Sequence, residues 1–434
     1  MKQFNVLTPY AGEPYAHNLI EVAVYGDSRL AGTHSNTTNY SSQVENAMSP
    51  AGWVSVKTDG KVVFPADLNF AVGGDTTTDM LARLSSVAQS RADIVLILAS
   101  TNDRGSAAMT ADATIANFRT MLNALSHKTV WFIAELPRGD STYTSNRLSA
   151  PQLQYHAKVR TWLREVAPNI YPNVVTFDCY PDFAQWDSTT GDAILGYLHD
   201  GLHLSTRGAE IAALPIAAYV NAYYPTKSIA PTTNSDGYST DNPYGWLNSN
   251  PLFTSTGGSI GSGGSGTIAA NWVFARNSAA AAGTVAAALS KVTTPGGDWQ
   301  QLVITGNTVS NSGPQFSLHQ DIVLGNLSVA DVLIAIGQIE VDAGAAGIIA
   351  AQLSVRTENP TVYESKSLDR RDAANPYPTT LQKGTHVTPY NIYPPVIPTV
   401  CRVRCIVDMA ENYTGVNATI RFRRVGVRKT IPQI

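Results

Sequence analysis

The 434-residue chain has few charged residues, few cysteines and no long apolar run. Charged residues make up 15% of it and the formal net charge is -3, which argues against nucleic acid as a partner and against a basic membrane-binding face. No window comes near the roughly 20 consecutive apolar residues that a membrane-spanning helix needs. Residues 1–18 lack a basic stretch followed by an apolar one, so no signal peptide is visible.

The three cysteines, Cys179, Cys401 and Cys405, are too few for a disulfide framework. In the stretch CRVRC, Cys401 and Cys405 would lie on one face of a strand, about 13 Å apart, which is too far for a disulfide bond. No histidine lies near them, and neither HExxH nor a clustered Cys/His spacing occurs. We therefore expect buried or interface thiols, no metal site and no cofactor.

Up to about residue 225, apolar runs of strand length alternate with segments of helical periodicity. The expected strands lie at 21–26, 67–74, 93–100, 129–136 and 173–179, and the expected helices at 41–49, 76–92, 113–126, 150–167 and 205–224. Five such units, with nearly uninterrupted Val, Ile and Leu in the strands, predict a parallel sheet covered by helices on both faces. In such a sheet, ligands bind beyond the carboxyl ends of the strands.

The composition changes at about residue 226. Residues 226–268 are rich in Gly, Ser, Thr, Asn and Pro, which is typical of a linker. Later β-branched runs, separated by turn residues, lie at 299–306, 315–324, 332–343, 348–357, 400–410 and 418–429. We predict an α/β domain at 1–225, a linker at 226–268 and an all-β sandwich or jelly roll at 269–434. The alanine-rich stretch 278–289 fits a helix and a packed strand equally well.

Ser28 comes two residues after the first expected strand, in the stretch VYGDSRLAG. A serine in this position is most often a helix cap, and it can also be a nucleophile if a base and hydrogen-bond donors lie at the same edge of the sheet. Three later motifs supply such groups. Gly74 and Asn102 follow the second and third expected strands, and the stretch DGLH places Asp200 and His203 before the last helix.

These residue types together fit ester hydrolysis. A serine hydroxyl is a weak nucleophile until a base takes its proton, which His203 can do. Asp200 can accept a hydrogen bond from the ring and stabilise its cation. The backbone N–H groups of Ser28 and Gly74 and the side-chain amide of Asn102 can bind the oxyanion. We predict Ser28, Asp200 and His203 as catalytic residues, and Ser28, Gly74 and Asn102 as the oxyanion hole.

The four motifs, in this order, resemble those of the SGNH hydrolases, or GDSL-type esterases, over residues 20 to about 222. The resemblance implies a flavodoxin-like doubly wound sheet. Two positions depart from the family pattern. Arg29 directly follows the serine, so the leucine of GDSL stands at position 30, and Ser100 replaces the glycine of GxND. The β-carbon of Ser100 would narrow the acyl pocket and favour a small acyl group such as acetyl. An α/β-hydrolase is not expected, because no G-x-S-x-G surrounds Ser28.

Residues beside these motifs have simpler interpretations. We expect Asp27 to brace its loop, Asp103 to cap a helix and Arg29 to be exposed to solvent. His34 and His199 could line the pocket.

The stretch 250–276, NPLFTSTGGSIGSGGSGTIAANWVFAR, is followed by GGDWQQLVITG at 296–306. On these stretches, residues 245–430 resemble galactose-binding-like jelly rolls and the domains attached to SGNH esterases in bacteriophage tail proteins. Exposed aromatic rings hold sugars by stacking on their apolar faces, whereas buried ones fill a core. The candidates for either role are Trp246, Trp272, Trp299, Tyr363, Tyr377, Tyr390 and Tyr393.

The resulting hypothesis is a carbohydrate O-acetyl esterase whose partner is an acetylated polysaccharide of a bacterial capsule or O-antigen. It would be extracellular or part of a virion, and a homotrimer would suit a tail protein. The alternatives are a secreted plant-polysaccharide (xylan-type) acetyl esterase and a glycan-binding virion protein without catalytic activity.

Overall fold

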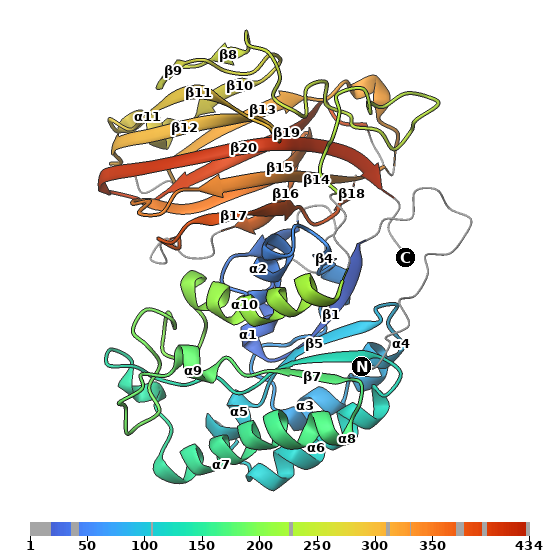
Figure 1. Ribbon diagram of the computed structural model, residues 1–434, viewed down its shortest axis with the longest axis vertical. Helices are drawn as coiled ribbons and strands as arrows, with labels where there is room; N and C mark the ends of the chain where they lie inside the picture. Colours follow the sequence, from blue (N-terminus) through green and yellow to red (C-terminus); the bar gives the residue numbers. More distant parts are fainter. Residues whose placement is uncertain are drawn as a thin grey trace.

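The computed structural model describes residues 19–35, 43–105, 107–224, 229–309, 313–329, 331–369, 377–392 and 397–430. An α/β domain packs against a two-sheet β-sandwich, and helices α2 (Pro50–Lys57) and α10 (Thr206–Tyr223) lie between the two (Figure 1). Within these residues, no helix is both long enough and apolar enough to cross a membrane.

A parallel sheet forms the centre of the α/β domain, and its described strands have the order β4-β1-β5-β6-β7. The strands are Ile20–Gly26 (β1), Val62–Val63 (β4), Ile94–Leu98 (β5), Thr129–Ile133 (β6) and Val174–Phe177 (β7). Successive strands along the chain therefore take the order 2-1-3-4-5, which confirms the predicted flavodoxin-like doubly wound sheet.

Helices cover both faces of this sheet. Side chains alternate along β1, so that Val22 and Val24 belong to the core shared with α2 and α10, while Ala23 and Tyr25 belong to the core on the opposite face. Figure 1 shows α6, α7 and α8 on this opposite face, away from the sandwich. The other helical segments of the domain are Ser28–Ala31 (α1), Ala66–Leu68 (η1), Thr77–Leu81 (α3), Leu84–Gln89 (α4), Thr101–Gly105 (α5), Ala111–Ala124 (α6), Thr144–Asn146 (η2), Ala150–Thr161 (α7), Trp162–Val166 (η3, a π-helix), Ala167–Ile170 (α8) and Tyr180–Phe183 (α9).

Two predicted elements of this domain were wrong. The second strand in chain order is Val62–Val63 (β4), at one edge of the sheet. Residues 67–74 run beside β1 without forming a strand: Asn69 makes an isolated bridge to Val24, and the Phe70 and Val72 N–H groups donate to the carbonyls of Val24 and Gly26 at 2.7 and 3.0 Å. The segment 41–49 contains a strand, Val44–Asn46 (β3), in place of a helix. The helix starts at Pro50, where Ser49 caps it and proline takes the first position, and β3 finds its partner strands far away in the sequence.

The sandwich consists of two sheets, whose described strands have the orders β2-β3-β16-β15-β19-β13-β10-β8 and β17-β14-β20-β12-β11-β9, with β18 paired to β14. All six predicted runs coincide with strands, which confirms the predicted all-β sandwich. The alanine-rich stretch holds both a helix and the start of a strand. The elements are His34–Ser35 (β2), Val44–Asn46 (β3), Ser259–Ile260 (β8), Gly264–Gly266 (β9), Val273–Arg276 (β10), Ser278–Ala282 (α11), Ala286–Thr294 (β11), Gly297–Asn307 (β12), Gln315–Asp321 (β13), Leu324–Asn326 (η4), Val332–Val341 (β14), Ile348–Asn359 (β15), Thr361–Asp369 (β16), Gln382–Val387 (β17), Asn391–Ile392 (β18), Val400–Met409 (β19) and Thr414–Thr430 (β20).

The predicted domain boundaries at 225 and 269 stay a prediction, but two features cross them. Strands β8 and β9 lie inside the segment predicted as a linker and pair with β10 and β11. Strands β2 and β3 come from the N-terminal part of the chain and extend a sheet of the sandwich. The two halves of the chain are therefore interwoven.

The three cysteines are buried and free, as expected.

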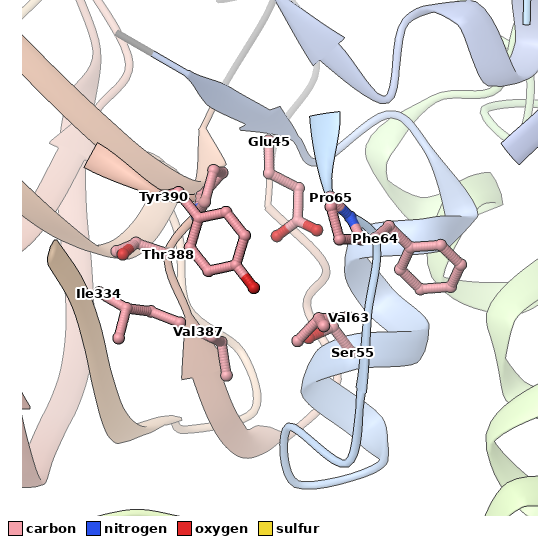
Figure 2. A pocket seen from close by; sticks show the side chains of 10 residues that line it. Glu45, Ser55, Val63, Phe64, Pro65, Ile334, Val387, Thr388 and Tyr390 are labelled. Carbon is pink, nitrogen blue, oxygen red and sulfur yellow. The ribbon is translucent and has the colours of Figure 1, made fainter. Parts of the chain in front are cut away.

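Polar contacts join the α/β domain to the sandwich, and a small cavity lies between them. The Lys57 ammonium donates to Gln382 Oε1 at 2.6 Å, and the Tyr390 hydroxyl donates to Glu21 Oε1 at 3.1 Å. Figure 2 shows the Glu45 carboxyl group and Tyr390 pointing into the cavity, whose volume of about 20 Å³ is enough for one water molecule. Burial raises the pKa of Glu45 to about 8, although a backbone hydrogen bond at Leu368 opposes this.

We expect Glu45 to make the protein less stable as the pH rises. In the unfolded chain Glu45 ionises near its ordinary pKa of 4.5, whereas in the folded protein it keeps its proton up to about pH 8. Its stabilising contribution is thus fully present below pH 4.5 and is lost between pH 4.5 and 8. At pH 8.5 the free energy of unfolding of Glu45→Gln should therefore exceed that of the wild type by a few kcal/mol, which urea titration shows as a higher midpoint. At pH 5 the two midpoints should nearly agree. Equal differences at the two pH values would contradict this prediction.

Candidate active site

Ser28 opens helix α1 directly after β1, but it is not the cap of that helix. Asp27 is the N-cap, and its carboxylate accepts the backbone N–H of Arg29 at 3.0 Å. The Arg29 side chain turns back onto the same carboxylate through Nε at 3.0 Å and Nη2 at 2.7 Å. Both side chains are buried, so the expected bracing role of Asp27 is confirmed and the expected exposure of Arg29 is wrong. The turn is held by its own residues, and the Ser28 hydroxyl is not needed for capping.

The structure brings Ser28, Asp200 and His203 together in one line of hydrogen bonds. His203 Nε2 lies 2.9 Å from Ser28 Oγ, and His203 Nδ1 lies 2.7 Å from Asp200 Oδ2. The other oxygen of Asp200 accepts the backbone N–H groups of Leu202 at 2.9 Å and His203 at 2.7 Å. An ionised carboxylate can only accept hydrogen bonds, so Nδ1 must carry a proton, and Nε2 of the neutral ring is left to accept from Ser28.

Asp200 is held in its ionised form. Partial burial favours its neutral form, but the hydrogen bonds from the His203 ring and from the two backbone N–H groups outweigh burial and hold its pKa well below its ordinary value. A permanently charged Asp200 can stabilise a positive charge on His203, which is what a general base needs when it takes a proton.

The loop that carries Asp200 and His203 packs against the segment around η2. Asn146 donates its side-chain amide to the Asp200 carbonyl at 2.7 Å. Gly201 has a φ of 80°, and a β-carbon at this position would lie 2.5 Å from the Tyr143 Cβ. A glycine is therefore required between the acid and the base, both for the backbone conformation and for the close approach of Tyr143.

Gly74 and Asn102 are linked through the residue that follows Gly74. The Asn102 amide donates to the carbonyl of Asp75, next to Gly74, at 2.9 Å. Gly74 has a φ of 86° and open space around its Cα, so glycine is needed there for the backbone angle. Gly73, which the sequence did not single out, lies against Ser28 and lines the cavity beside it. The role of Gly74 and Asn102 in an oxyanion hole stays a prediction.

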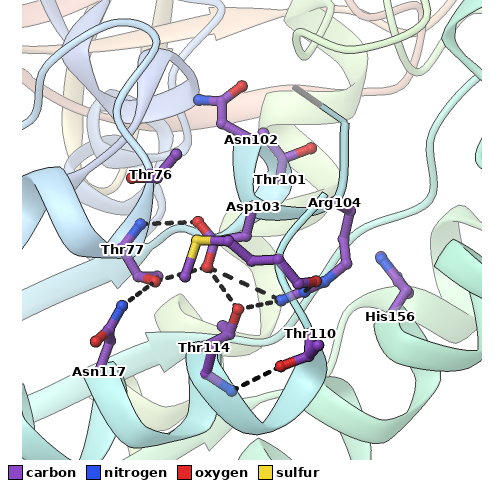
Figure 3. A network of polar contacts seen from close by, with 12 residues as sticks. Thr76, Thr77, Thr101, Asn102, Asp103, Arg104, Thr110, Thr114, Asn117 and His156 are labelled. Carbon is purple, nitrogen blue, oxygen red and sulfur yellow. Dashed lines mark hydrogen bonds and ion pairs between the residues drawn. The ribbon is translucent and has the colours of Figure 1, made fainter. Parts of the chain in front are cut away.

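A buried network fixes the helix on which Asn102 lies (Figure 3). Asp103 Oδ1 accepts the backbone N–H of Thr77 at 2.8 Å, and Oδ2 accepts the hydroxyls of Thr77 and Thr114, both at 2.6 Å. Asp103 thereby binds the first turn of α3 and one side of α6 in addition to lying on α5. Asp103 was expected to cap a helix, and it does so at the first turn of the neighbouring helix α3. These bonds hold α5 in place and with it Asn102.

A cavity of about 650 Å³ lies beside Ser28 and His203. His34 and His199, which the sequence left as possible pocket residues, are both among its lining residues. Sequence reasoning missed Ser35, Asn46 and Met48, which also line it and come from the segment around β2 and β3. No motif marks these three residues, because their place depends on pairing with a strand more than 300 residues away.

His199, Asp200 and His203 are also the group of three potential metal ligands that the described residues contain, with ligand atoms within 4.8 Å of one another. Both ring nitrogens of His203 are already hydrogen-bonded, Nδ1 to Asp200 at 2.7 Å and Nε2 to Ser28 at 2.9 Å, so an ion here would have to replace one of these bonds. The donor set therefore fits an acid–base pair better than a resident ion.

Most aromatic residues predicted as sugar-binding candidates fill the interior. Trp246, Trp272, Trp299 and Tyr377 are at most 5% exposed, so of the two roles considered for these rings, sugar stacking and a place in the core, the second holds for them. Tyr363 and Tyr390 are half-buried, and Tyr393 lies outside the described residues.

Trp186, which was not among the candidates, is 94% exposed, whereas the other six tryptophans are buried. Its position within the polar stretch QWDSTTGD was the sequence signal that could have identified it.

Ser100 stands where the family pattern has a glycine. Its φ is 80°, which is a strained conformation for a serine. Its side chain is fully buried and its hydroxyl has no hydrogen-bond partner within the described residues. Ser100 is not among the residues that line the cavity, so its β-carbon gives no support to the expected narrowing of an acyl pocket.

The sequence model of the GDSL-like lipase/acylhydrolase family matches residues 24–211, in agreement with the resemblance noted from the four motifs. Among solved structures, the chain is similar to a GDSL-like lipase from Bacteroides thetaiotaomicron, with 17% identity over 47% of this chain and 88% of that one and a TM-score of 0.35. It is also similar to a member of the lipolytic protein G-D-S-L family from Veillonella parvula (15% identity, 47% and 98%, TM-score 0.35). A third is a carbohydrate esterase family 3 protein from Talaromyces cellulolyticus (18% identity, 46% and 96%, TM-score 0.33). A comparison with curated proteins gave no match.

We expect Ser100→Gly to stabilise the protein by about 1 kcal/mol, because it removes both the backbone strain and a buried hydroxyl without a partner. The urea midpoint of the variant, compared with that of the wild type at equal slope, measures this effect. Ser86→Ala on the exposed side of α4 serves as a control that should change the midpoint little. A lower midpoint for Ser100→Gly would mean that the hydroxyl has a stabilising partner.

Proposed function

We propose that the protein is a serine esterase that removes O-acetyl groups from a polysaccharide, because residues 24–211 match the sequence model of the GDSL-like lipase/acylhydrolase family. The observation that carries this proposal is the line of hydrogen bonds from Ser28 through His203 to Asp200, with distances of 2.9 and 2.7 Å. It supplies a nucleophile, a base and an orienting carboxylate at the edge of a single cavity.

The reaction follows from these positions. Ser28 Oγ attacks the acetyl carbonyl carbon while His203 Nε2 takes the hydroxyl proton, and Asp200 stabilises the charged ring. The backbone N–H groups of Ser28 and Gly74 and the Asn102 amide stabilise the oxyanion. The intermediate collapses as His203 returns the proton to the departing sugar oxygen. Water, deprotonated by His203, then attacks the acetyl-serine, and acetic acid and the free enzyme result.

Two features support a polymeric, sugar-containing substrate. The cavity opens to solvent at its edge, where Ser35 and Gly73 are exposed, so a chain can lie across it. Trp186 offers a fully accessible ring of the kind that stacks on sugars. Its loop is tied to the site: the Gln185 N–H donates to the carbonyl of Asp192, whose carboxylate pairs with Arg147, next to the Asn146 that contacts Asp200.

For the substrate we propose an acetylated bacterial capsule or O-antigen, and for the location an extracellular or virion-associated one. Incubation with acetylated capsule, O-antigen and xylan, followed by measurement of free acetate, tests this choice. Release from xylan alone would instead assign the protein to plant-polysaccharide deacetylation.

Ser28→Ala should lower hydrolysis of p-nitrophenyl acetate by several orders of magnitude, because no other group in the line can form the acyl intermediate. It should also abolish labelling by a fluorophosphonate probe, with the unfolding midpoint little changed. Ser86→Ala on α4 should keep both activities. A wild-type protein that neither hydrolyses the ester nor takes up the probe would favour a glycan-binding protein without catalytic activity.

Trp186→Ala should raise the KM for an acetylated polysaccharide about tenfold and leave kcat/KM for p-nitrophenyl acetate unchanged, because only the polymer reaches the exposed ring. Trp186→Phe keeps an aromatic face and should restore most of the affinity. Since the side chain is 94% exposed, neither change should alter stability. An unchanged KM for the polymer would remove Trp186 from the binding surface.

A further inference from the structure

A short hairpin connects the nucleophile to the C-terminal sandwich. Strand β2 pairs with β3, and β3 runs parallel to β16, where Lys366 N–H donates to the Gln43 carbonyl at 3.1 Å and Ala47 N–H donates to the Asp369 carbonyl at 2.9 Å. At its other side, Asn46 N–H donates to the carbonyl of Thr33 at 2.9 Å. The Thr33 hydroxyl in turn donates to the Leu30 carbonyl in α1, at 2.6 Å. The hairpin is thus fixed both to the helix of Ser28 and to the sandwich.

The two faces of β3 serve different cavities. Glu45 points into the small interface cavity between the two halves of the chain (Figure 2). Its neighbour Asn46 lines the large cavity beside Ser28, as does Ser35 on β2. This division follows from the alternation of side chains along a strand.

Asn46 presents a hydrogen-bond donor to the large cavity. Its Oδ1 accepts the Met48 backbone N–H at 2.9 Å, and since an amide nitrogen cannot accept, this contact fixes which atom is the oxygen. The Nδ2 group has no hydrogen-bond partner within the described parts of the chain, although the residue is only 4% exposed. A buried amide with one end satisfied and the other at a cavity is a ready site for a ligand oxygen.

The surroundings of Asn46 suit the rest of a sugar ring. Met48 and Leu204 also line the cavity and offer apolar contacts, while Ser35 and His199 offer polar ones. A sugar has apolar C–H faces and oxygen acceptors around its ring, so it can use both kinds of contact.

From this arrangement we infer that Asn46 is a substrate-binding residue, whose Nδ2 donates a hydrogen bond to a hydroxyl or ring oxygen of the sugar unit that carries the ester. The inference rests on the proposed function and adds to it that the sandwich, through β16, positions a specificity-determining residue of the esterase site.

Asn46→Ala should raise the KM for a mono-O-acetylated monosaccharide, whose other hydroxyls are free, about tenfold, because one buried hydrogen bond is lost, and kcat should change little. Hydrolysis of p-nitrophenyl acetate, which lacks the sugar, should change less than twofold. Asn46→Ser keeps a hydroxyl that can accept the Met48 N–H, is too short to present a donor to the sugar and adds no charge beside His203, so it should show the same selectivity even if the alanine variant is poorly folded. Glu45→Gln is the matched control, because it changes the adjacent residue on the other face of β3 and should leave both substrates unaffected.

Equal losses on both substrates in the two Asn46 variants would overturn the inference, since they would indicate a general disturbance of the site. An unchanged KM for the sugar ester would overturn it as well. A wild-type protein that cleaves p-nitrophenyl acetate but releases no acetate from the sugar ester would overturn the proposed substrate and this role of Asn46 together. A wild type active on the sugar with unaffected Asn46 variants would overturn the role alone.

Discussion

The buried ion pair of Asp27 and Arg29 is the constraint on which the position of Ser28 depends. Asp27 is fully buried, Arg29 is 4% exposed, and two side-chain hydrogen bonds join them directly beside the serine. A buried charge without its partner destabilises a protein by about 3–5 kcal/mol, so the turn has one favourable arrangement. Glu135 lies 3.9 Å from Arg29, but burial raises its pKa to about 7 in spite of the arginine. Asp27 is therefore the carboxylate that neutralises Arg29.

The turn is connected to the rest of the site on two sides. On one side the Ser28 hydroxyl is hydrogen-bonded to His203, which is bonded to Asp200. The loop of these two residues is held by Asn146 and by the close packing of Gly201 on Tyr143. On the other side, Thr33 is hydrogen-bonded to Leu30 in α1 and joins this helix to the β2–β3 hairpin, which pairs with β16 of the sandwich. The sandwich therefore belongs to the frame of the cavity, which is a different role from that of a tethered binding module.

The sequence was most informative where the structure depends on local patterns. The strands of the parallel sheet other than β4, the six runs of the sandwich and the proximity of Ser28, Asp200 and His203 could all be predicted, because periodicity and motif spacing act over short distances. It was least informative for β3, the exposure of Arg29 and the cavity wall at Asn46. The strand forms because β16 offers it a partner, and Arg29 is buried because Asp27 accepts its guanidinium. The sequence left open which aromatic residues of the sandwich are exposed, because composition does not tell which face of a strand is covered.

The register of β3 against β16 determines which side chains of β3 face the interface between the two halves and which face the large cavity. A slip of one residue along β16 would turn Glu45 toward the large cavity and Asn46 toward the interface, since neighbouring side chains on a strand face opposite ways. Two backbone hydrogen bonds at adjacent residues, Asn46 to Thr33 and Ala47 to Asp369, oppose such a slip from the two sides of the strand. A neutral Glu45 fits the interface cavity, whereas a carboxylate beside His203 would alter the charge balance of the acid–base pair. The pairing of β3 with the sandwich thus preserves both the interface and the polarity of the esterase site.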